Sequence, residues 1–327
     1  MTTLSPVADI FTPVAAGLAA TESVLSDLFT NDSEAVMGLC RHLTRFGGKR
    51  LRPALVHLTA GMVGTPTDEH AIIGAMVEAL HMASLLHDDV LDGADTRRQV
   101  ATLNALHGNE IPILLGDVLY SRAFALSLNM STLYAARELA VASEAICRGE
   151  IEQSFLRFRL DVPDSAYFDV IRAKTAQMYA TACSLGARYA GGSEAQVQSL
   201  ARFGFDLGMG FQIIDDCLDI VGDERVVGKS LGTDLETGKI TLPILRLGRR
   251  LSGADLQRYK DLVMGDVQGS RRDALRAAFD VDAVVTECQH EANTFVERCL
   301  ATLAPFAEGP EKRSLQSVCR FVLARTF

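Results

Sequence analysis

Residues 71–92 read AIIGAMVEALHMASLLHDDVLD, and this stretch decides the fold class. Its apolar residues recur at spacings of three and four, which predicts an α-helix rather than an alternating strand. The stripe consists of Ile72, Met76, Ala79, Ala83, Leu86 and Val90. A group of aspartates follows at its end, so an apolar helix leads directly into a cluster of like charges.

The same apolar spacing recurs along most of the chain. It is clear in residues 116–130, 135–158, 169–192 and 197–220, which are rich in good helix formers. We find no convincing β-hairpin signal, no GxGxxG and no GxxxxGK[ST] loop. Because no linker divides the chain, we predict one all-α domain over residues 1–327, built as a helical bundle.

Composition excludes several classes of protein. The net charge of −9 argues against a nucleic-acid-binding protein, which needs a basic face. The first basic residue is Arg41, so the N-terminus resembles neither a secretory signal nor a transit peptide. No uncharged apolar run reaches the roughly 18–20 residues of a membrane span. The seven cysteines are odd in number and widely spaced, which indicates reduced, mostly buried thiols in a cytoplasmic protein.

The aspartates at the end of the first stretch form a DDxxD pattern. Asp88 and Asp92 are four positions apart, so a helix places them on one face, with Asp89 beside them. Carboxylates about 5 Å apart repel by roughly 3 kcal/mol at an effective dielectric near 20, so protons or cations must relieve the cluster. The pattern fits neither an EF-hand nor a zinc site. A solvated helix end would explain one such pattern equally well.

A second aspartate cluster favours a cation-binding site over a solvated helix end. Residues 211–220, FQIIDDCLDI, repeat the spacing as Asp215, Asp216 and Asp219, again at the end of an apolar helix. Two facing carboxylate clusters suit Mg²⁺, which prefers a few carboxylates together with waters and phosphate oxygens. The ligand that this arrangement predicts is a diphosphate bridged by metal.

Basic residues stand where a diphosphate would need them. Each of them alone would be an ordinary solvated charge, but seven of them lie in segments suited to phosphate. They are Lys49, Arg50, Arg52, Arg97, Arg98, Lys229 and Lys239.

Together these residues resemble the trans-isoprenyl diphosphate synthases, the polyprenyl synthetase family. The motifs appear in order as GGKRLRP, HMASLLHDDVLD, DTRRQVATLN, GDVLYSRAF, AKT, GFQIIDDCLD and GKSLGTDLETGKITLP. The resemblance covers most of the chain and is closest to the long-chain, octaprenyl-type branch. It implies an all-α bundle with a deep central cavity, an Mg²⁺ cofactor, and usually a homodimer that condenses an allylic diphosphate with isopentenyl diphosphate.

The resemblance also implies a role for each matching residue. Mg²⁺ on the allylic diphosphate would be held by Asp88, Asp89, Asp92, Asp215 and Asp219, with Asp216 in the same motif. That diphosphate would be neutralised by Arg97, Lys174, Lys229 and Lys239. Isopentenyl diphosphate would be held without metal by Lys49, Arg52, His81 and Arg98. The oxygens of Thr175 and Gln212 would face the developing allylic cation.

Two positions depart from the family pattern. Gln99 stands where the family's RRG motif has Gly, and we expect it to alter the local turn because Gly tolerates backbone angles that Gln does not. His107 stands where an aromatic residue is usual. Neither departure removes a charged ligand, so we expect an active enzyme.

Family resemblance further implies that residues beneath the first motif set the product length. Ser84 and Ala83, four and five positions before Asp88, are small, and an open tunnel would then favour a long product of about C30–C50. The other residues expected along the tunnel are Leu80, Met76 and Phe124. If Phe124 closes the tunnel floor, the product would instead be a C20 geranylgeranyl diphosphate.

Two further alternatives stay open at this point. A terpene cyclase or head-to-head synthase is disfavoured by the second DDxxD and by GGKRLRP. A partner subunit of a heteromeric synthase typically loses aspartates, and all six are present here. The sequence leaves open a peripheral membrane contact for product release.

Overall fold

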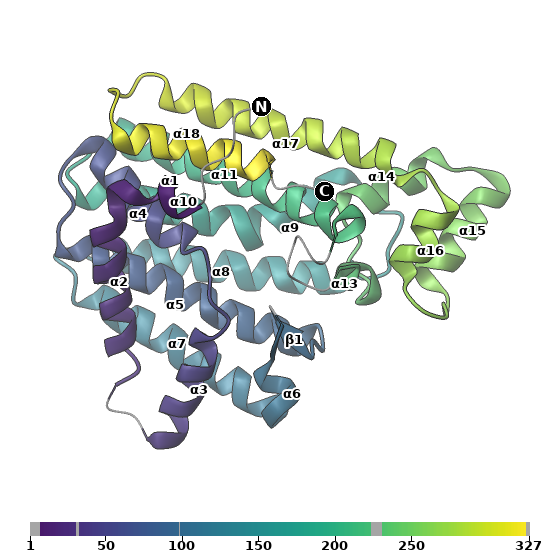
Figure 1. The fold of residues 1–327 in the computed structure, drawn as a ribbon, viewed down its shortest axis with the longest axis horizontal. Coiled ribbons are helices and arrows are strands. Elements are labelled where there is room, and N and C mark those ends of the chain that lie inside the picture. Colours follow the sequence, from purple (N-terminus) through teal and green to yellow (C-terminus); the bar gives the residue numbers. More distant parts are fainter. Residues whose placement is uncertain (1–6, 31–32, 98, 224–230, 325–327) are drawn as a thin grey trace.

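The computed structural model describes residues 7–30, 33–97, 99–223 and 231–324, and over these ranges the chain is almost wholly helical (Figure 1). The first part contains α1 (Val7–Ile10), the 3-10 turn η1 (Thr12–Val14), α2 (Ala15–Asp27), α3 (Glu34–Thr44), α4 (Leu51–Val63), α5 (Asp68–Leu91) and α6 (Leu103–His107). The middle contains α7 (Glu110–Leu128), α8 (Tyr134–Phe155), α9 (Asp164–Ile171), the π-helical turn η2 (Arg172–Ala176), α10 (Gln177–Tyr189) and α11 (Glu194–Val221). The last part contains α13 (Thr233–Glu236), α14 (Leu242–Arg250), α15 (Gly253–Met264), α16 (Arg271–Ala278), α17 (Val281–Leu303) and α18 (Pro310–Leu323). The expectation of an all-α fold is confirmed.

The stretch over residues 71–92 lies at the centre of the molecule. It forms most of α5, which is buried on every side between Ile73 and Leu80 rather than along one stripe only. A helix that is buried all round in this way, with Glu78 as its charged member, is a central helix. It packs against α2, α4, α7 and α10.

The helix α10 links the two motif-bearing helices, because it packs against both α5 and α11. Two glycines allow α10 to lie close to its neighbours, Gly186 toward α4 and Gly204 between α10 and α11. A Cβ at Gly186 would lie 2.2 Å from the Val56 carbonyl oxygen of α4, and a Cβ at Gly204 of α11 would lie 2.4 Å from the Tyr179 carbonyl oxygen. The motif-bearing helices are therefore fixed to a common support.

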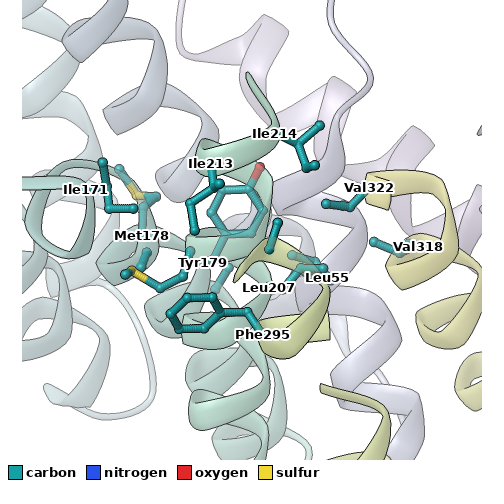
Figure 2. Packing of buried hydrophobic residues seen from close by; sticks show 14 of the residues in the cluster. Leu55, Ile171, Met178, Tyr179, Leu207, Ile213, Ile214, Phe295, Val318 and Val322 are labelled. Atoms are coloured by element: carbon teal, nitrogen blue, oxygen red, sulfur yellow. The ribbon is translucent and has the colours of Figure 1, made fainter. Parts of the chain in front are cut away.

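The main hydrophobic core surrounds Tyr179 of α10 (Figure 2). Leu55 of α4, Leu207 of α11 and Val318 of α18 belong to the same cluster. The helices α17 and α18 run along one long side of the molecule and cover this core (Figure 1). A second cluster lies nearer the aspartate end of α5, where Ala83 belongs to the same group as Leu119 of α7.

One short hairpin corrects the expectation that hairpins are missing. β1 (Thr96–Arg97) pairs antiparallel with β2 (Val100–Ala101), with Thr96 opposite Ala101. Gln99 in the intervening turn has a φ of 64°, in the left-handed region that Gly occupies without strain. The sequence lacked a hairpin signal because Gln, and not Gly, stands at this position. The local turn that Gln99 was expected to alter is the turn of this hairpin.

One helix in the described ranges is long and apolar enough to cross a membrane by length and composition alone. It is the 19-residue α7, and about 33% of its apolar window is buried inside the molecule. A core helix can pass the same test, so this finding alone is weak evidence of a span. As expected, six of the seven cysteines are buried, with Cys147 exposed.

Candidate active site

The first aspartate motif lies at the C-terminal end of α5. Asp88 and Asp89 fall in its last turn and Asp92 is its C-cap residue. The C-terminal end of a helix carries a partial negative charge, so it adds to the repulsion within the motif. In this structure each aspartate is paired with a basic side chain from a different segment.

Asp89 is the most deeply buried member, with only 1% of its surface exposed. Arg97 of β1 donates from Nε at 2.8 Å and from Nη2 at 2.6 Å, in both cases to Oδ1. Burial raises the pKa of Asp89 and the charges of Asp88 and Asp92 raise it further, although Arg97 opposes them. The other oxygen, Oδ2, is buried and has no hydrogen-bond partner among the described residues. Asp89 therefore offers one oxygen for a further cation.

Asp88 faces the π-helical turn η2, which presents Lys174. The Lys174 Nζ lies 3.7 Å from Asp88 Oδ1, donates to Gln153 Oε1 at 2.9 Å, and forms an ion pair with Glu150. Single π-helical turns inside helices are frequent at functional sites because they re-aim side chains. Here the turn brings Lys174 to the first motif, and its role in neutralising a diphosphate stays a prediction.

Asp92 is held by two cations. Lys239, which is buried, donates from Nζ to Oδ2 at 2.5 Å, and Arg157 donates from Nη2 to Oδ1 at 3.0 Å. The segment of Lys239 is also tied to the second motif, because the Gly232 N–H donates to the Asp219 carbonyl oxygen at 2.9 Å.

The second motif lies in the last turns of α11, where Asp216 and Asp219 are buried. Asp219 Oδ2 accepts a hydrogen bond from the Asp234 N–H at 3.3 Å. Asp216 accepts from Tyr167 OH at 2.7 Å and from Gln212 Nε2 at 2.8 Å. Burial raises the pKa of Asp216 well above its usual range, and the charge of Asp234 adds to the shift. Asp216 is thus held inside the protein by Tyr167 and Gln212, and its role in the reaction stays a prediction.

The two residues expected to face the allylic cation meet each other. Thr175 Oγ1 donates to Gln212 Oε1 at 2.8 Å, and Gln212 in turn donates to Asp216. The hydroxyl proton of Thr175 is thereby directed at Gln212. The remaining lone pairs of the Thr175 and Gln212 oxygens can face a positive charge.

The residues expected to bind isopentenyl diphosphate lie near aromatic rings. Lys49 Nζ lies 4.4 Å from the Phe321 ring centroid and the Arg52 guanidinium lies 4.7 Å from that of Tyr179. The Nε of Arg52 is buried and lacks a hydrogen-bond partner in the described part of the chain. His81 is half-buried on α5. Arg98 and Lys229 lie outside the described residues.

Arg50, the remaining basic residue of GGKRLRP, is paired with two carboxylates. It has a φ of 46° and donates to Glu78 Oε1 of α5 at 2.7 Å and to Glu22 Oε1 of α2 at 2.5 Å. Glu78 is only 5% exposed. Arg50 therefore anchors the segment between Lys49 and Arg52 to the core.

Four of the five expected chain-length residues lie on α5 itself, and Phe124 lies on α7. Met76, Leu80 and Ala83 are buried, Phe124 packs against the main core, and the Ser84 hydroxyl donates to the His81 carbonyl oxygen at 2.8 Å. Two surface cavities, of about 570 and 360 Å³, are lined by other residues, among them Arg249 and Arg298, and include no motif aspartate. The tunnel and the deep central cavity stay predictions.

Sequence reasoning missed four residues that complete this site. Glu150 and Gln153 hold Lys174, Tyr167 holds Asp216, and Arg157 holds Asp92. Glu150 and Gln153 are spaced three apart, so a helix places them on one face. This spacing next to Gly149 could have indicated a pair of polar side chains that act together. Arg157 and Tyr167 gave none, because their partners lie far away in the sequence.

The donor set suits a hard divalent cation. Carboxylate oxygens are the ligands that Mg²⁺ and Ca²⁺ prefer, and the open Oδ2 of Asp89 provides one. Among the described residues, however, no three His, Cys, Asp or Glu side chains converge closely enough to hold a metal ion. The aspartates of the first motif are turned toward separate cations, so metal binding there would require some of these ion pairs to exchange.

The fold and site define an all-α enzyme with two aspartate-rich motifs surrounded by basic side chains. The family model for polyprenyl synthetase matches residues 33–280, and the chain belongs to that family of prenyltransferases. It is 31% identical over 321 residues to the geranyl-diphosphate-specific all-trans-nonaprenyl-diphosphate synthase of Rhodobacter capsulatus, covering 97% of each chain. It is 40% identical over 228 residues to heptaprenyl diphosphate synthase component 2 of Geobacillus stearothermophilus, covering 70% of this chain and 71% of that one.

A solved structure of a polyprenyl synthase from Caulobacter crescentus, complexed with calcium and isoprenyl diphosphate, matches with a TM-score of 0.94 at 29% identity. The match covers 99% of both chains. The fold expected for the family is thereby confirmed.

Proposed function

We propose that this chain condenses an allylic diphosphate, geranyl or farnesyl, with successive isopentenyl diphosphates to give a long-chain all-trans polyprenyl diphosphate. The observation that carries the proposal is the pairing of both aspartate motifs with the segment around Lys239, which contacts Asp92 directly and Asp219 through Gly232. Full-length similarity to a nonaprenyl-diphosphate synthase supports the long product.

Members of the family generally depend on a divalent metal, and we infer that Mg²⁺ serves here. Bound Mg²⁺ would supply positive charge that stabilises the leaving pyrophosphate, with oxygen ligands from Asp88, Asp89, Asp92, Asp215 and Asp219. The calcium in the Caulobacter crescentus structure is a hard cation with the same preference for oxygen.

The protein's own side chains would perform three tasks. Arg97, Lys174 and Lys239 would stabilise negative charge on the pyrophosphate as the allylic C–O bond breaks. The oxygens of Thr175 and Gln212 would face the cation that this leaves. The double bond of isopentenyl diphosphate then attacks the cation and forms the new C–C bond, and the departing pyrophosphate accepts the proton that is lost.

Isopentenyl diphosphate would bind without metal to Lys49, Arg52 and His81, together with Arg98. The buried Nε of Arg52 supports this placement, because a buried donor without a partner costs about 1–3 kcal/mol until a ligand satisfies it. The ion pairs of Arg50 hold the backbone between Lys49 and Arg52.

We infer that the chain forms a homodimer through α7 and α8, which pack against each other. Both expose large apolar side chains, including Leu114 at 52%, Ile151 at 58% and Phe155 at 79%. Exposed apolar residues on adjoining helices are typical of an interface between subunits. This face also explains why α7 is apolar and yet only partly buried.

A second candidate is a catalytic partner in a heteromeric synthase. The 40% identity to a heptaprenyl diphosphate synthase component 2 favours it. In that case the chain would keep its aspartates but need another subunit for activity.

The test is an assay of the purified chain alone, with Mg²⁺, radiolabelled isopentenyl diphosphate, and geranyl or farnesyl diphosphate. We expect products of about C30–C50 by mass, and a C20 product would support the geranylgeranyl alternative. Activity that appears only with a second subunit would support the heteromeric one. A chain that leaves isopentenyl diphosphate unconsumed under every condition would contradict the proposal.

We further propose a cytoplasmic enzyme, in line with its buried cysteines, whose oily product leaves through peripheral membrane contact. Co-sedimentation with anionic vesicles in the presence and absence of product tests that contact. The proposal predicts that the protein sediments with the vesicles when product is present.

A further inference from the structure

Arg157, which follows directly after α8, joins three parts of the site. Its Nη2 donates to Asp92 Oδ1 at 3.0 Å and to the Leu91 carbonyl oxygen at 3.3 Å, both at the end of α5. Its Nη1 donates to the Thr237 carbonyl oxygen at 3.4 Å, in the segment that carries Lys239. One planar guanidinium therefore bridges the first motif and the turn beside the second.

The backbone after Arg157 strengthens the same connection. The Phe158 N–H donates to the Gly238 carbonyl oxygen at 2.8 Å, and a Cβ at Gly238 would lie 2.3 Å from the Phe158 ring. Phe158 itself has a left-handed φ of 59°, a conformation that costs a non-glycine residue roughly 1–2 kcal/mol. The surrounding contacts therefore hold this turn in place.

The two cations on Asp92 differ in how they are held. Lys239 contacts Asp92 through a single flexible ammonium group, and in the proposed function it moves to the diphosphate. Arg157 has two backbone carbonyl contacts besides Asp92, and these contacts do not depend on the Asp92 carboxylate. Arg157 can thus keep the Asp92 carboxylate oriented while Lys239 moves from Asp92 to the diphosphate.

We propose that Arg157 is a positioning residue, which holds Asp92 and the turn over residues 237–239 in the geometry that binds the metal–diphosphate complex. This inference rests on the proposed function, and nothing in the family motifs of the sequence assigns it. Arg157 acts through its planar fork and not through its charge alone, because Lys cannot reach the three acceptors at once.

The test compares Arg157→Lys with Arg159→Lys, two substitutions that keep the charge and remove the fork. Arg159 is a matched control, since it lies two residues away and pairs only with the exposed Asp161 at 3.3 Å among the described residues. The first readout is the binding of Mn²⁺ in the presence of inorganic pyrophosphate. Binding is measured from the electron paramagnetic resonance signal of the Mn²⁺ that stays free. We expect Arg157→Lys to weaken Mn²⁺ binding by about tenfold, and Arg159→Lys to leave it unchanged.

Two further readouts separate positioning from a general loss of structure. In the metal-free protein, amide exchange at Phe158 and Lys239 should accelerate in Arg157→Lys and in a second variant, Arg157→Gln. In the assay, the KM for the allylic diphosphate should rise about tenfold while that for isopentenyl diphosphate stays within about twofold.

Wild-type Mn²⁺ affinity in Arg157→Lys, or unchanged exchange in both variants, would overturn the inference. An effect confined to Arg157→Gln would assign Arg157 a charge role and would overturn it as well. These outcomes differ from a failure of the proposed function, in which the wild-type chain itself consumes no isopentenyl diphosphate with Mg²⁺.

Discussion

Tyr167 of α9 donates a hydrogen bond of 2.7 Å to the buried carboxylate of Asp216 in α11. The carboxylate also accepts from Gln212, which accepts from Thr175, so one chain of hydrogen bonds runs from α9 to the π-helical turn. Asp216 thereby acts on the site through its neighbours.

This chain predicts the effect of Tyr167→Phe. The substitution should destabilise the fold by about 1–3 kcal/mol, because it leaves a buried carboxylate oxygen without its donor. It should also lower kcat about tenfold, since Gln212 and Thr175 lose their alignment. Urea unfolding and steady-state kinetics measure the two effects.

Tyr259→Phe is the matched control for this prediction. Tyr259 is also buried and donates to the Ile244 carbonyl oxygen at 2.7 Å, away from both motifs. It should lose stability without losing kcat. Equal losses of kcat in the two variants would show that the Tyr167 effect is merely structural.

Ala83→Phe tests the proposed tunnel. Ala83 is fully buried beside Leu119, so a phenyl ring would extend into any space beneath the first motif at a packing cost of about 1–3 kcal/mol. The product should become shorter while turnover persists, and Ala83→Val should give an intermediate length. Mass analysis of the products decides, and an unchanged product distribution in both variants would refute the tunnel assignment.

His57 predicts a loss of stability in acid. It is buried, its Nε2 lies 2.9 Å from Thr21 Oγ1, and burial, with a contribution from His70, lowers its pKa from 6.5 to about 4. The folded protein favours the neutral ring, so His57's contribution is complete above pH 6.5 and declines as the pH falls toward 4. The slope is about 1.4 kcal/mol per pH unit.

Urea unfolding at pH 7 and pH 5 measures this slope. His57→Gln should reduce the difference in unfolding free energy between the two pH values. Comparing the two pH values within each variant cancels any change in baseline stability. Equal pH dependence in wild type and His57→Gln would contradict the assignment.

The fold and the two aspartate motifs could be predicted from the sequence because both depend on local spacing. The 3–4 repeat fixes α5, and four-residue spacing places Asp88 and Asp92 on one face. The family pattern also drew attention to Gln99, which adopts a left-handed φ of 64° in the turn, and its effect on that turn stays a prediction.

The ion-pair partners could not be predicted in the same way. Arg50 and Arg52 look alike in GGKRLRP, and only the fold shows that Glu22 and Glu78 reach Arg50. Arg157 likewise meets Asp92 across 65 residues of sequence. Such contacts depend on tertiary packing, which spacing along one helix does not encode.

In the proposed function, the first aspartate motif is required for a metal-dependent condensation. Asp89→Asn keeps the shape of the side chain and removes its charge beside Arg97. The most direct measurement is Mg²⁺-dependent release of pyrophosphate from allylic and isopentenyl diphosphates, with Asp161→Asn as the exposed control. We predict one pyrophosphate per isopentenyl unit in wild type and control, and a rate at least about 100-fold lower in Asp89→Asn with helical circular dichroism intact. A near-normal rate in Asp89→Asn would show that the condensation does not require the first aspartate motif.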